Sequence, residues 1–290
     1  MTFSLRAGLA SLRAELFKLR RRPGNWVIGA IMLALLILLG YLLGWIVFNH
    51  PPKGARFPAR FDRLAARLDY YPQSMVHQVL SSMGELGSAL CMILGVLAVG
   101  SEYGWETFKT MLTQRPTRLQ TIAGRAVALA VITLICAIGL FAAAFVLSVV
   151  IVSIDGQPLQ LPTVLSLLEG AGALWLMFYV WASFGMMLAY VFRQSAMAIG
   201  IGLVYLLLLE TLLLRLLGII GGAWVKDPTD VLPHSVMTSL AATFTGGYHA
   251  AGEVIAAPAV SATQAVVTLV LYAVAFNIVG AALFRNRDVT

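Results

Sequence analysis

The chain has 290 residues, of which 60% are hydrophobic and 11% are charged, and its formal net charge at neutral pH is +7. Ordinary soluble domains carry about 25% charged residues, and about 55–60% of their surface is already apolar. A water-soluble fold of this length has no place for so much additional apolar surface, so the composition indicates a protein embedded in lipid. The positive charge does not indicate nucleic-acid binding, because the basic residues gather at the ends of apolar runs, where they determine membrane topology.

Six apolar runs are long enough to cross a membrane, since a helix needs about 20 residues to span the hydrocarbon core. Helices are favoured over strands because a helix satisfies its backbone hydrogen bonds within one segment, and the runs lack the alternation of barrel strands. The sequence therefore predicts an all-α integral membrane protein with a single domain over residues 1–290. The predicted spans are Trp26–Phe48, Met75–Val99, Ile122–Val152, Gly170–Phe192, Ala196–Leu217 and Thr263–Phe284.

The distribution of Lys and Arg predicts that both termini are cytoplasmic. With the N-terminus inside, the cytoplasmic segments hold the larger share of basic residues, which is the usual bias of membrane proteins. An even number of spans agrees with this N-in, C-in topology. The exception is the first outer loop, because most of the basic residues on the outer side lie there: Lys53, Arg56, Arg60, Arg63 and Arg67, with Lys226 in a later loop.

Residues 50–74, the first outer loop, have an amphipathic pattern. Four arginines recur at i, i+4, i+7 and i+11, and apolar residues repeat the same spacing one position later. This pattern predicts a helix that lies flat in the outer interface, with its arginines toward the headgroups. It serves either as a surface anchor or as a lid that meets an amphipathic or anionic substrate.

Residues 1–22 form a second amphipathic segment on the cytoplasmic side. Their leucines make one stripe, at Leu5, Leu9, Leu12, Leu16 and Leu19. This stripe predicts a helix half-sunk in the inner leaflet, with the basic residues 20–22 at the acidic headgroups. Contact with a cytoplasmic partner is the alternative.

Small residues indicate close helix packing at two places. Gly40 and Gly44 form a G-x-x-x-G pattern on the first span, and Ser81 and Ser88 flank Glu85 on a small, polar side of the second span. Small residues allow membrane helices to approach closely, and a polar helix side can also line a wet cavity.

Ionisable residues inside predicted spans are expected to pair with another helix or to face a cavity. Glu85 interrupts the second span, and Glu210 and Arg215 interrupt the fifth. A structural pairing and a place in a translocation path are both compatible with Glu85, whereas pairing is favoured for Arg215. Glu210 and Arg215 are five residues apart and do not share a helix face, so each is expected to pair with another helix rather than with the other.

Motifs of soluble and metal-dependent enzymes are missing from the sequence. There is no G-x-x-x-x-G-K-[ST], so the chain cannot build a P-loop, and no H-E-x-x-H, G-x-S-x-G or paired-cysteine spacing is present. We therefore expect no catalytic residues, no cofactor and no resident metal. The histidines all fall on the predicted outer side, as scattered interfacial residues or, alternatively, as part of an outer metal site: His50, His77, His234 and His249.

Residues 100–121, between the second and third spans, are the most informative segment. Charged, aromatic and threonine residues gather there, Phe108, Met111 and Leu112 make an apolar edge, and Pro116 ends any helix before it. The pattern predicts a short surface helix joined to two spans, which is a suitable handle for a cytoplasmic motor. A solvated loop explains the same pattern almost as well.

This segment resembles the type-2 ABC-transporter permease family. That family carries an acidic-aromatic pair, Gly-Thr, a basic residue, Leu-Leu, Pro, Ser/Thr-Arg and a basic residue that opens span three. The chain departs from the pattern at Glu106, where the family often has glycine. In the same order the chain has Glu102-Tyr103, Thr107, Lys109, Met111-Leu112, Pro116, Thr117-Arg118 and Arg125.

The resemblance extends over the six-span layout and reaches the last outer region, residues 225–262. There, Leu232-Pro233 is followed by a helix-like stretch, Ser235–Phe244, which in the family belongs to short re-entrant helices on the outer side.

The resemblance implies a permease that dimerises and binds two copies of a separate ABC ATPase subunit, which would carry ATP and Mg. Residues 100–121 would include the coupling helix, with ATPase coupling by Glu102, Tyr103, Thr107, Lys109 and Arg118. Substrate would pass between two permease copies, along a translocation path that includes Glu85, Ser81, Ser88 and Glu210. A homodimer and a heterodimer are both compatible with one chain.

Our hypothesis is an exporter permease in a prokaryotic cytoplasmic membrane, because the outer loops are too short for a substrate-capturing domain. Two alternatives stay open. One is an ion-coupled carrier that uses Glu85 and Glu210, and the other is a membrane scaffold or enzyme subunit without transport activity. Drugs, lipids, peptides and polysaccharide precursors are all compatible substrates.

Overall fold

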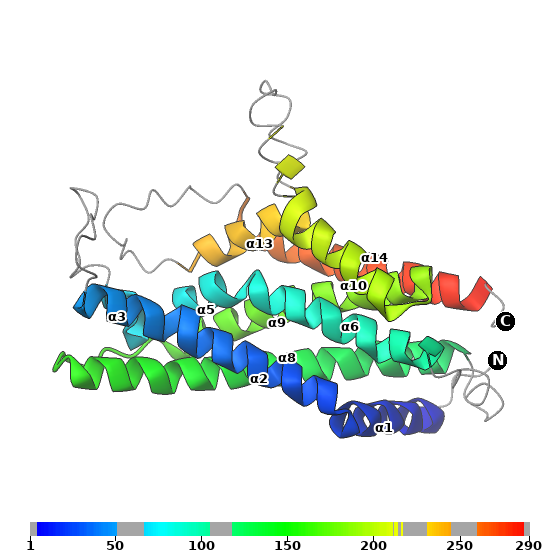
Figure 1. Cartoon of the computed structure of the whole chain (residues 1–290), viewed down its shortest axis with the longest axis horizontal. Helices are drawn as coiled ribbons and strands as arrows, with labels where there is room; N and C mark the ends of the chain where they lie inside the picture. The colour runs from blue at the N-terminus through cyan, green and yellow to red at the C-terminus, as the bar shows by residue number, and fades with distance from the viewer. Residues whose placement is uncertain are drawn as a thin grey trace.

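The computed structural model describes residues 5–50, 67–104, 118–210, 212–213, 216, 231–244 and 260–286, and this part of the chain is helical, without strands. Most of the helices run side by side as an elongated bundle (Figure 1). In chain order the elements are α1 (Leu5–Arg21), α2 (Pro23–Leu35), η1 (Leu36–Leu42), α3 (Leu43–Asn49), η2 (Pro72–Ser74), α5 (Met75–Met83), α6 (Leu86–Gly104), α8 (Arg118–Ile154), α9 (Val164–Phe192), α10 (Ser195–Val204), η3 (Tyr205–Leu209), α13 (Pro233–Ala242) and α14 (Ala262–Asn286).

Four helical stretches are long and apolar enough to cross a membrane, and they coincide with the first, third, fourth and sixth predicted spans. Many of their large apolar side chains point outward; Leu271 and Ile278, for example, are each 63% exposed. Such a surface is stable only if lipid surrounds it. The chain is therefore a membrane-spanning protein that is helical in its described part. The four stretches are Pro23–Asn49, Gln120–Ile154, Val164–Phe192 and Ala262–Arg285.

We expected the second span, Met75–Val99, to be one continuous helix, and it is not. It consists of α5 and α6, which meet at a 53° bend and can be counted together as a fifth span. A Cβ atom added at Gly84 would lie 2.5 Å from the Leu80 carbonyl oxygen, so the backbone at the bend requires a glycine. The polar residue Glu85 follows directly in the break.

The fifth predicted span, Ala196–Leu217, is described only in part. Its first half is a short apolar helix over Ser195–Leu209, made of α10 and η3 and shorter than the other spans. Residues 211, 214–215 and 217 fall outside the described residues, and Arg215 is among them. Whether this segment crosses the membrane therefore stays a prediction.

The centre of the bundle is the contact between α6 and α9, and α9 is the most buried of the long helices. A Cβ atom added at Gly95 would lie 1.9 Å from the Ala182 carbonyl oxygen, and one at Gly185 would lie 2.1 Å from the Met92 carbonyl oxygen. The two backbones thus touch at two reciprocal points. This close approach is the usual role of small residues in membrane helices.

The predicted packing face at Gly40 and Gly44 is confirmed. A Cβ atom at Gly40 would lie 3.3 Å from the Ser82 hydroxyl, and one at Gly44 would lie 1.8 Å from the Tyr70 hydroxyl. The π-helical turns of η1 fall at the same place, and the Gln78 side-chain amide donates to the Gly40 carbonyl oxygen. The first span is therefore joined to α5 by both packing and a hydrogen bond.

The predicted N-terminal helix is present as α1, but the described part of its apolar stripe packs against protein rather than into the leaflet. Leu12 and Leu16 pack against the core and Leu19 is buried in it. The Ser11 hydroxyl donates to the Gln120 carbonyl oxygen of α8 at 3.2 Å. A Cβ atom at Gly124 would lie 2.6 Å from the Ser11 hydroxyl, so this glycine lets α1 approach α8 closely.

The last turns of α6, α9 and α14 and the first turns of α8 lie at the same end of the bundle as α1 (Figure 1). We call this the charged end. Of the basic side chains that the structure describes, Arg67 alone belongs to the opposite end, while the others are Arg13, Lys18, Arg20, Arg21, Arg22, Arg125, Arg193 and Arg285.

Candidate functional site

Five charged side chains form an ion cluster at the charged end. Glu102 lies near the end of α6 and is 2% exposed, and Arg125 lies in the first turns of α8 and is 1% exposed. The Arg125 guanidinium is 2.6 Å from one Glu102 oxygen. The other three members are Glu15 and Lys18 of α1 and Arg22, which lies between α1 and α2.

The N-terminal helix closes this cluster from outside. Lys18 lies 2.6 Å from the second Glu102 oxygen and 3.1 Å from Glu15. Arg22 lies 3.8 Å from Glu102 and donates to the Leu97 carbonyl oxygen at 2.9 Å. Glu15 in turn lies 3.4 Å from Arg125. The cluster therefore links α1, α6 and α8 through charges that are largely shielded from solvent.

Tyr190 connects a fourth helix, α9, to the ion cluster. Its hydroxyl accepts a hydrogen bond from Arg125 at 3.1 Å, which connects the end of α9 to the ion cluster. Three cations face two carboxylates, so the cluster has a formal surplus of one positive charge. Buried charges of this kind are tolerated only when they are paired and hydrogen-bonded, so every member depends on the others.

Only one of the predicted coupling residues has a described side chain, and that is Glu102 in the ion cluster. Tyr103 belongs to α6 and Arg118 opens α8, but their side chains are outside the described part of the chain. Thr107 and Lys109 fall within residues 105–117, which are also outside it. The contact with a motor subunit stays a prediction, while the helices on both sides of that segment are joined by the ion cluster.

The opposite half of the bundle contains a cavity of about 240 Å³ between α5 and α13, which we call the Glu85 cavity. Ser81 and Glu85, which the sequence places in a translocation path, both line it and are exposed. Ser88 is instead fully buried in α6, and its hydroxyl has no hydrogen-bond partner among the described atoms. Further polar lining comes from His77, His234 and Thr238.

Glu210, the fourth residue expected in the translocation path, is not part of the cavity lining. Its carboxylate accepts hydrogen bonds from the backbone N–H groups of His234 at 2.5 Å and Ser235 at 3.3 Å, in the first turn of α13. The first N–H groups of a helix have no partner within the helix and carry partial positive charge, so a carboxylate there is stabilising. The expected pairing of Glu210 with another helix is confirmed.

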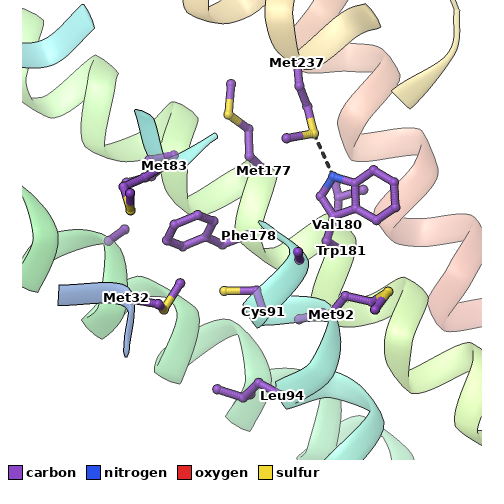
Figure 2. Packing of buried hydrophobic residues seen from close by; sticks show 14 of the residues in the cluster. Met32, Met83, Cys91, Met92, Leu94, Met177, Phe178, Val180, Trp181 and Met237 are labelled. Atoms are coloured by element: carbon purple, nitrogen blue, oxygen red, sulfur yellow. Dashed lines mark hydrogen bonds between the residues drawn. The ribbon is translucent and has the colours of Figure 1, made fainter. Parts of the chain in front are cut away.

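A second contact fixes α13 on the bundle. The Trp181 indole N–H donates to the Met237 sulfur at 2.7 Å, and Figure 2 shows Met237 reaching down from α13 to the Trp181 ring on α9. Buried tryptophan needs such a partner for its N–H, and the flexible thioether can adapt to it. Since Met237 also lines the Glu85 cavity, this contact sets the position of one cavity wall.

The described histidines do not make a metal site. His77 and His234 face the Glu85 cavity, but among the described residues no group of three or more His, Cys, Asp or Glu side chains is arranged to hold a metal ion. His249 lies outside the described residues. The interpretation of the outer histidines as a metal site gains no support from these positions.

The last arginine of the outer loop pairs with protein. Arg67 lies 3.1 Å from Asp155 at the end of α8 and donates to the Asn49 side chain. Tyr71 donates to Asp155 at 3.0 Å, and burial together with this carboxylate raises the pKa of the Tyr71 phenol to about 12. Arg67 therefore contacts Asp155, where we expected headgroup contact, and Arg56, Arg60 and Arg63 fall outside the described residues.

Sequence reasoning missed several polar residues of these sites. Glu15 and Tyr190 belong to the ion cluster, and Asn277 of α14 donates to Ser183 at 3.0 Å and to Tyr179 at 3.3 Å on α9. For Glu15 a signal was present, because this acid lies on the leucine-stripe face of α1. Asn277 sits in an otherwise apolar run, which is a weaker signal of the same kind.

Residues 61–290 match a protein family described as "Protein of unknown function (DUF2705)". No curated protein matches the chain. The matched segment begins shortly before α5 and ends with the last residue, so it contains the Glu85 cavity together with the α6, α8 and α9 parts of the ion cluster. Because this match covers well over half of its length, the chain belongs to the DUF2705 family.

Proposed function

We propose that the chain is the permease subunit of an ATP-binding-cassette exporter, coupled to ATP hydrolysis by a separate subunit. The observation that carries the proposal is the ion cluster around Glu102 and Arg125. These residues lie just before and just after residues 105–117, the segment whose sequence resembles a coupling helix.

The ion cluster suits a mechanical role. The 2.6 Å contact between Glu102 and Arg125 ties the end of α6 to the start of α8, and Lys18 ties α1 to both. A force on the segment between α6 and α8 would therefore move these helices together rather than bend the segment alone. Packed elements with charge pairs shift between discrete arrangements, which is how a motor subunit can switch a membrane domain.

The proposed topology has six spans with both termini in the cytoplasm of a prokaryotic cell. It is supported by the basic side chains, which, in the part of the chain that the structure describes, gather at the charged end except for Arg67. By the positive-inside bias this end is cytoplasmic. The fifth span would continue from α10 and η3.

The functional unit would be a permease dimer with two copies of the ATPase, which would hold ATP and Mg. The α13 helix, held by Glu210 and Trp181, would be one of the short re-entrant helices on the outer side. Substrate would move outward between the two permease copies, past the Glu85 cavity.

Co-purification tests this proposal. The tagged full chain, extracted from its native membrane in mild detergents, should bring down a P-loop ATPase in near-equal amount. Lys109→Glu and Arg118→Glu should lower the association and the stimulated ATPase rate, and Lys226→Glu, on the predicted outer side, is the control. Charge reversal of Glu102 is a poor test, because this buried carboxylate contacts three cations and its loss would disturb the fold.

Two results would overturn the proposal. One is the absence of an ATPase under several mild detergents. The other is unchanged association and stimulation in both Lys109→Glu and Arg118→Glu.

An ion-coupled carrier is the second candidate, favoured by the broken span at Glu85. Discontinuous helices at mid-membrane often form ion sites in carriers, and Glu85 lies in such a break and faces a cavity. Glu210 is less suited to this role, because its carboxylate already accepts from the N-terminus of α13. Glu85→Gln should abolish pH-driven flux in reconstituted vesicles, and flux that survives would exclude the carrier.

A further inference from the structure

The Glu85 carboxylate is open to a cavity and unpaired within the described part of the chain. It is exposed, it lines the cavity between α5 and α13, and no described side chain forms an ion pair or hydrogen bond with it. Glu102 and Glu210, in contrast, are both buried against partners. An ionisable group at membrane depth is costly unless it has a partner or serves a function. Of the three carboxylates, Glu85 is therefore the one that a ligand in a cavity can reach.

The hydroxyl groups of the cavity also offer acceptors rather than donors. The Ser81 hydroxyl donates its proton to the Gln78 carbonyl oxygen at 3.1 Å, and the Thr238 hydroxyl donates to the Ser235 carbonyl oxygen at 2.9 Å. A hydroxyl has one proton to donate and two lone pairs to accept with. With both protons used inside their own helices, the two oxygens can only accept from a ligand.

The described lining residues give the cavity a negative formal charge. Among the described lining residues Glu85 is the single carboxylate, and none of them is a Lys or Arg. The two histidines carry no charge when neutral, and in that form they do not change this sign. A ligand that fits must therefore bring positive charge and N–H donors, and both are properties of an ammonium group.

Size and lining limit what enters. The cavity volume of about 240 Å³ is below the roughly 300–1,000 Å³ typical of sites for drug-sized ligands. Leu80 and Met237 supply an apolar wall, and Met237 is held in place by Trp181, as Figure 2 shows. The space suits a small charged group with the beginning of an apolar chain attached.

We propose that the Glu85 cavity binds the primary ammonium group of an amine-bearing amphiphile, with Glu85 as the charge partner and Ser81 and Thr238 as neutral acceptors. The apolar chain of the ligand lies along Leu80 and Met237. The purpose of this binding, the selection of a cargo for export, rests on the proposed transport function. Binding itself is measured on the isolated chain, so the lack of an ATPase partner and the lack of amine binding are separate results.

Calorimetric titration of the full chain in phosphatidylcholine nanodiscs provides the test. The probes are hexylamine, hexanol and hexanoate, which share one chain and differ in the end group. Hexylamine should bind at least about tenfold more tightly than hexanol, because a charge-assisted hydrogen bond to a carboxylate exceeds a neutral one, and hexanoate should not bind. Equal binding of amine and alcohol would overturn the proposal.

Variants locate the binding. Glu85→Gln should weaken hexylamine binding by about tenfold and remove the preference over hexanol, since the amide keeps the shape and loses the charge. Glu169→Gln is the matched control, because Glu169 is an exposed carboxylate on α9 that lines a different groove. Equal unfolding temperatures of the three proteins show that folding is not the cause. Full hexylamine affinity in Glu85→Gln, or equal losses in both variants, would overturn the proposal.

Lipid composition separates two sources of the amine. Phosphatidylethanolamine carries a primary ammonium group, whereas the choline headgroup has no N–H to donate. If nanodiscs with phosphatidylethanolamine suppress hexylamine binding in the wild-type chain, the natural ligand is a lipid headgroup. If they leave it unchanged, while hexylamine still requires Glu85, the ligand is a free amphiphilic amine. Hexylamine binding that is independent of Glu85 in both lipids contradicts the assignment.

Discussion

The two halves of the bundle place a glutamate carboxylate in opposite surroundings. At the charged end Glu102 is 2% exposed and contacts Lys18, Arg22 and Arg125. In the other half Glu85 is exposed to a cavity and has no described partner. A carboxylate that is saturated with cations can hold helices together but cannot take a ligand, whereas an open one can take a ligand but contributes little to the fold. The comparison separates a stabilising site from a binding site.

Glu210 lies between these extremes. It is as buried as Glu102, but its partners are two backbone N–H groups of α13 instead of cations. Its interaction energy is that of a charge at a helix terminus, which is smaller than that of a buried ion pair. Variants at the charged end, at the helix crossing between the halves, at Glu210 and at Glu85 should therefore lose stability in decreasing order.

Arg125→Met should have the largest effect. It removes the most buried cation of the cluster and leaves Glu102 and Glu15 with Lys18 and Arg22 only. We expect a loss of about 3 kcal/mol in the free energy of unfolding, because breaking one partner of a buried ion pair leaves an uncompensated charge. Denaturant unfolding in detergent micelles measures it.

Arg13→Met is the matched control for Arg125→Met. Arg13 is an exposed arginine on α1 and should tolerate the same replacement with little change. Equal stability of the two variants would mean that the ion cluster does not hold the charged end together, and the comparison between the two halves would fail.

Gly95→Ala should have the next largest effect, since it acts on the helix pair that joins the two halves. The added methyl group would lie 1.9 Å from the Ala182 carbonyl oxygen, a backbone atom that cannot move without shifting α9. Overpacking of this kind costs about 1–3 kcal/mol. Gly139→Ala, on α8, is the control, because no atom lies within 4 Å of the added carbon. An unfolding midpoint that is the same in both variants would contradict the close crossing of α6 and α9.

Glu210→Gln should cost about 1 kcal/mol, because the amide oxygen can still accept from the first turn of α13 while the favourable charge at the helix N-terminus is lost. The effect should be local to α13. In Glu210→Gln, hydrogen exchange of the α13 amides should accelerate more than that of the α9 amides. The control is Glu169→Gln, a change at an exposed residue, which should alter exchange in neither helix. Unchanged exchange in α13 would show that Glu210 does not fix this helix.

The sequence predicted those features of the fold and the site that depend on the residues of a single segment. Apolar run length located the four long spans, and Gly40 with Gly44 was identified as a packing face from its spacing. Glu85 was singled out because an acid in an apolar run is unusual in itself. Each of these signals is local, because the property depends on residues within a few turns of one another.

The rest required knowledge of which distant residues meet. Glu102 was expected at the motor interface, and nothing in its neighbourhood reveals that Lys18, which is 84 residues away, reaches it at 2.6 Å. The reciprocal contacts of Gly95 and Gly185 likewise depend on how α6 crosses α9. The 53° bend at Gly84 was not predicted, because glycine is frequent in membrane helices and does not by itself indicate a break.

Glu85→Gln should have the smallest effect on the fold and is the sharpest test of the comparison, because Glu102→Gln makes the same chemical change in the other half. At Glu85 the replacement removes a charge that no described residue contacts, so the free energy of unfolding should stay within about 0.5 kcal/mol of the wild type. At Glu102 it leaves the three facing cations without their common partner, so the loss should be several times larger. Parallel denaturant titrations of the two variants measure the ratio. If Glu85→Gln costs as much as Glu102→Gln, Glu85 is a structural residue paired in the native membrane, and its carboxylate is not open to a ligand.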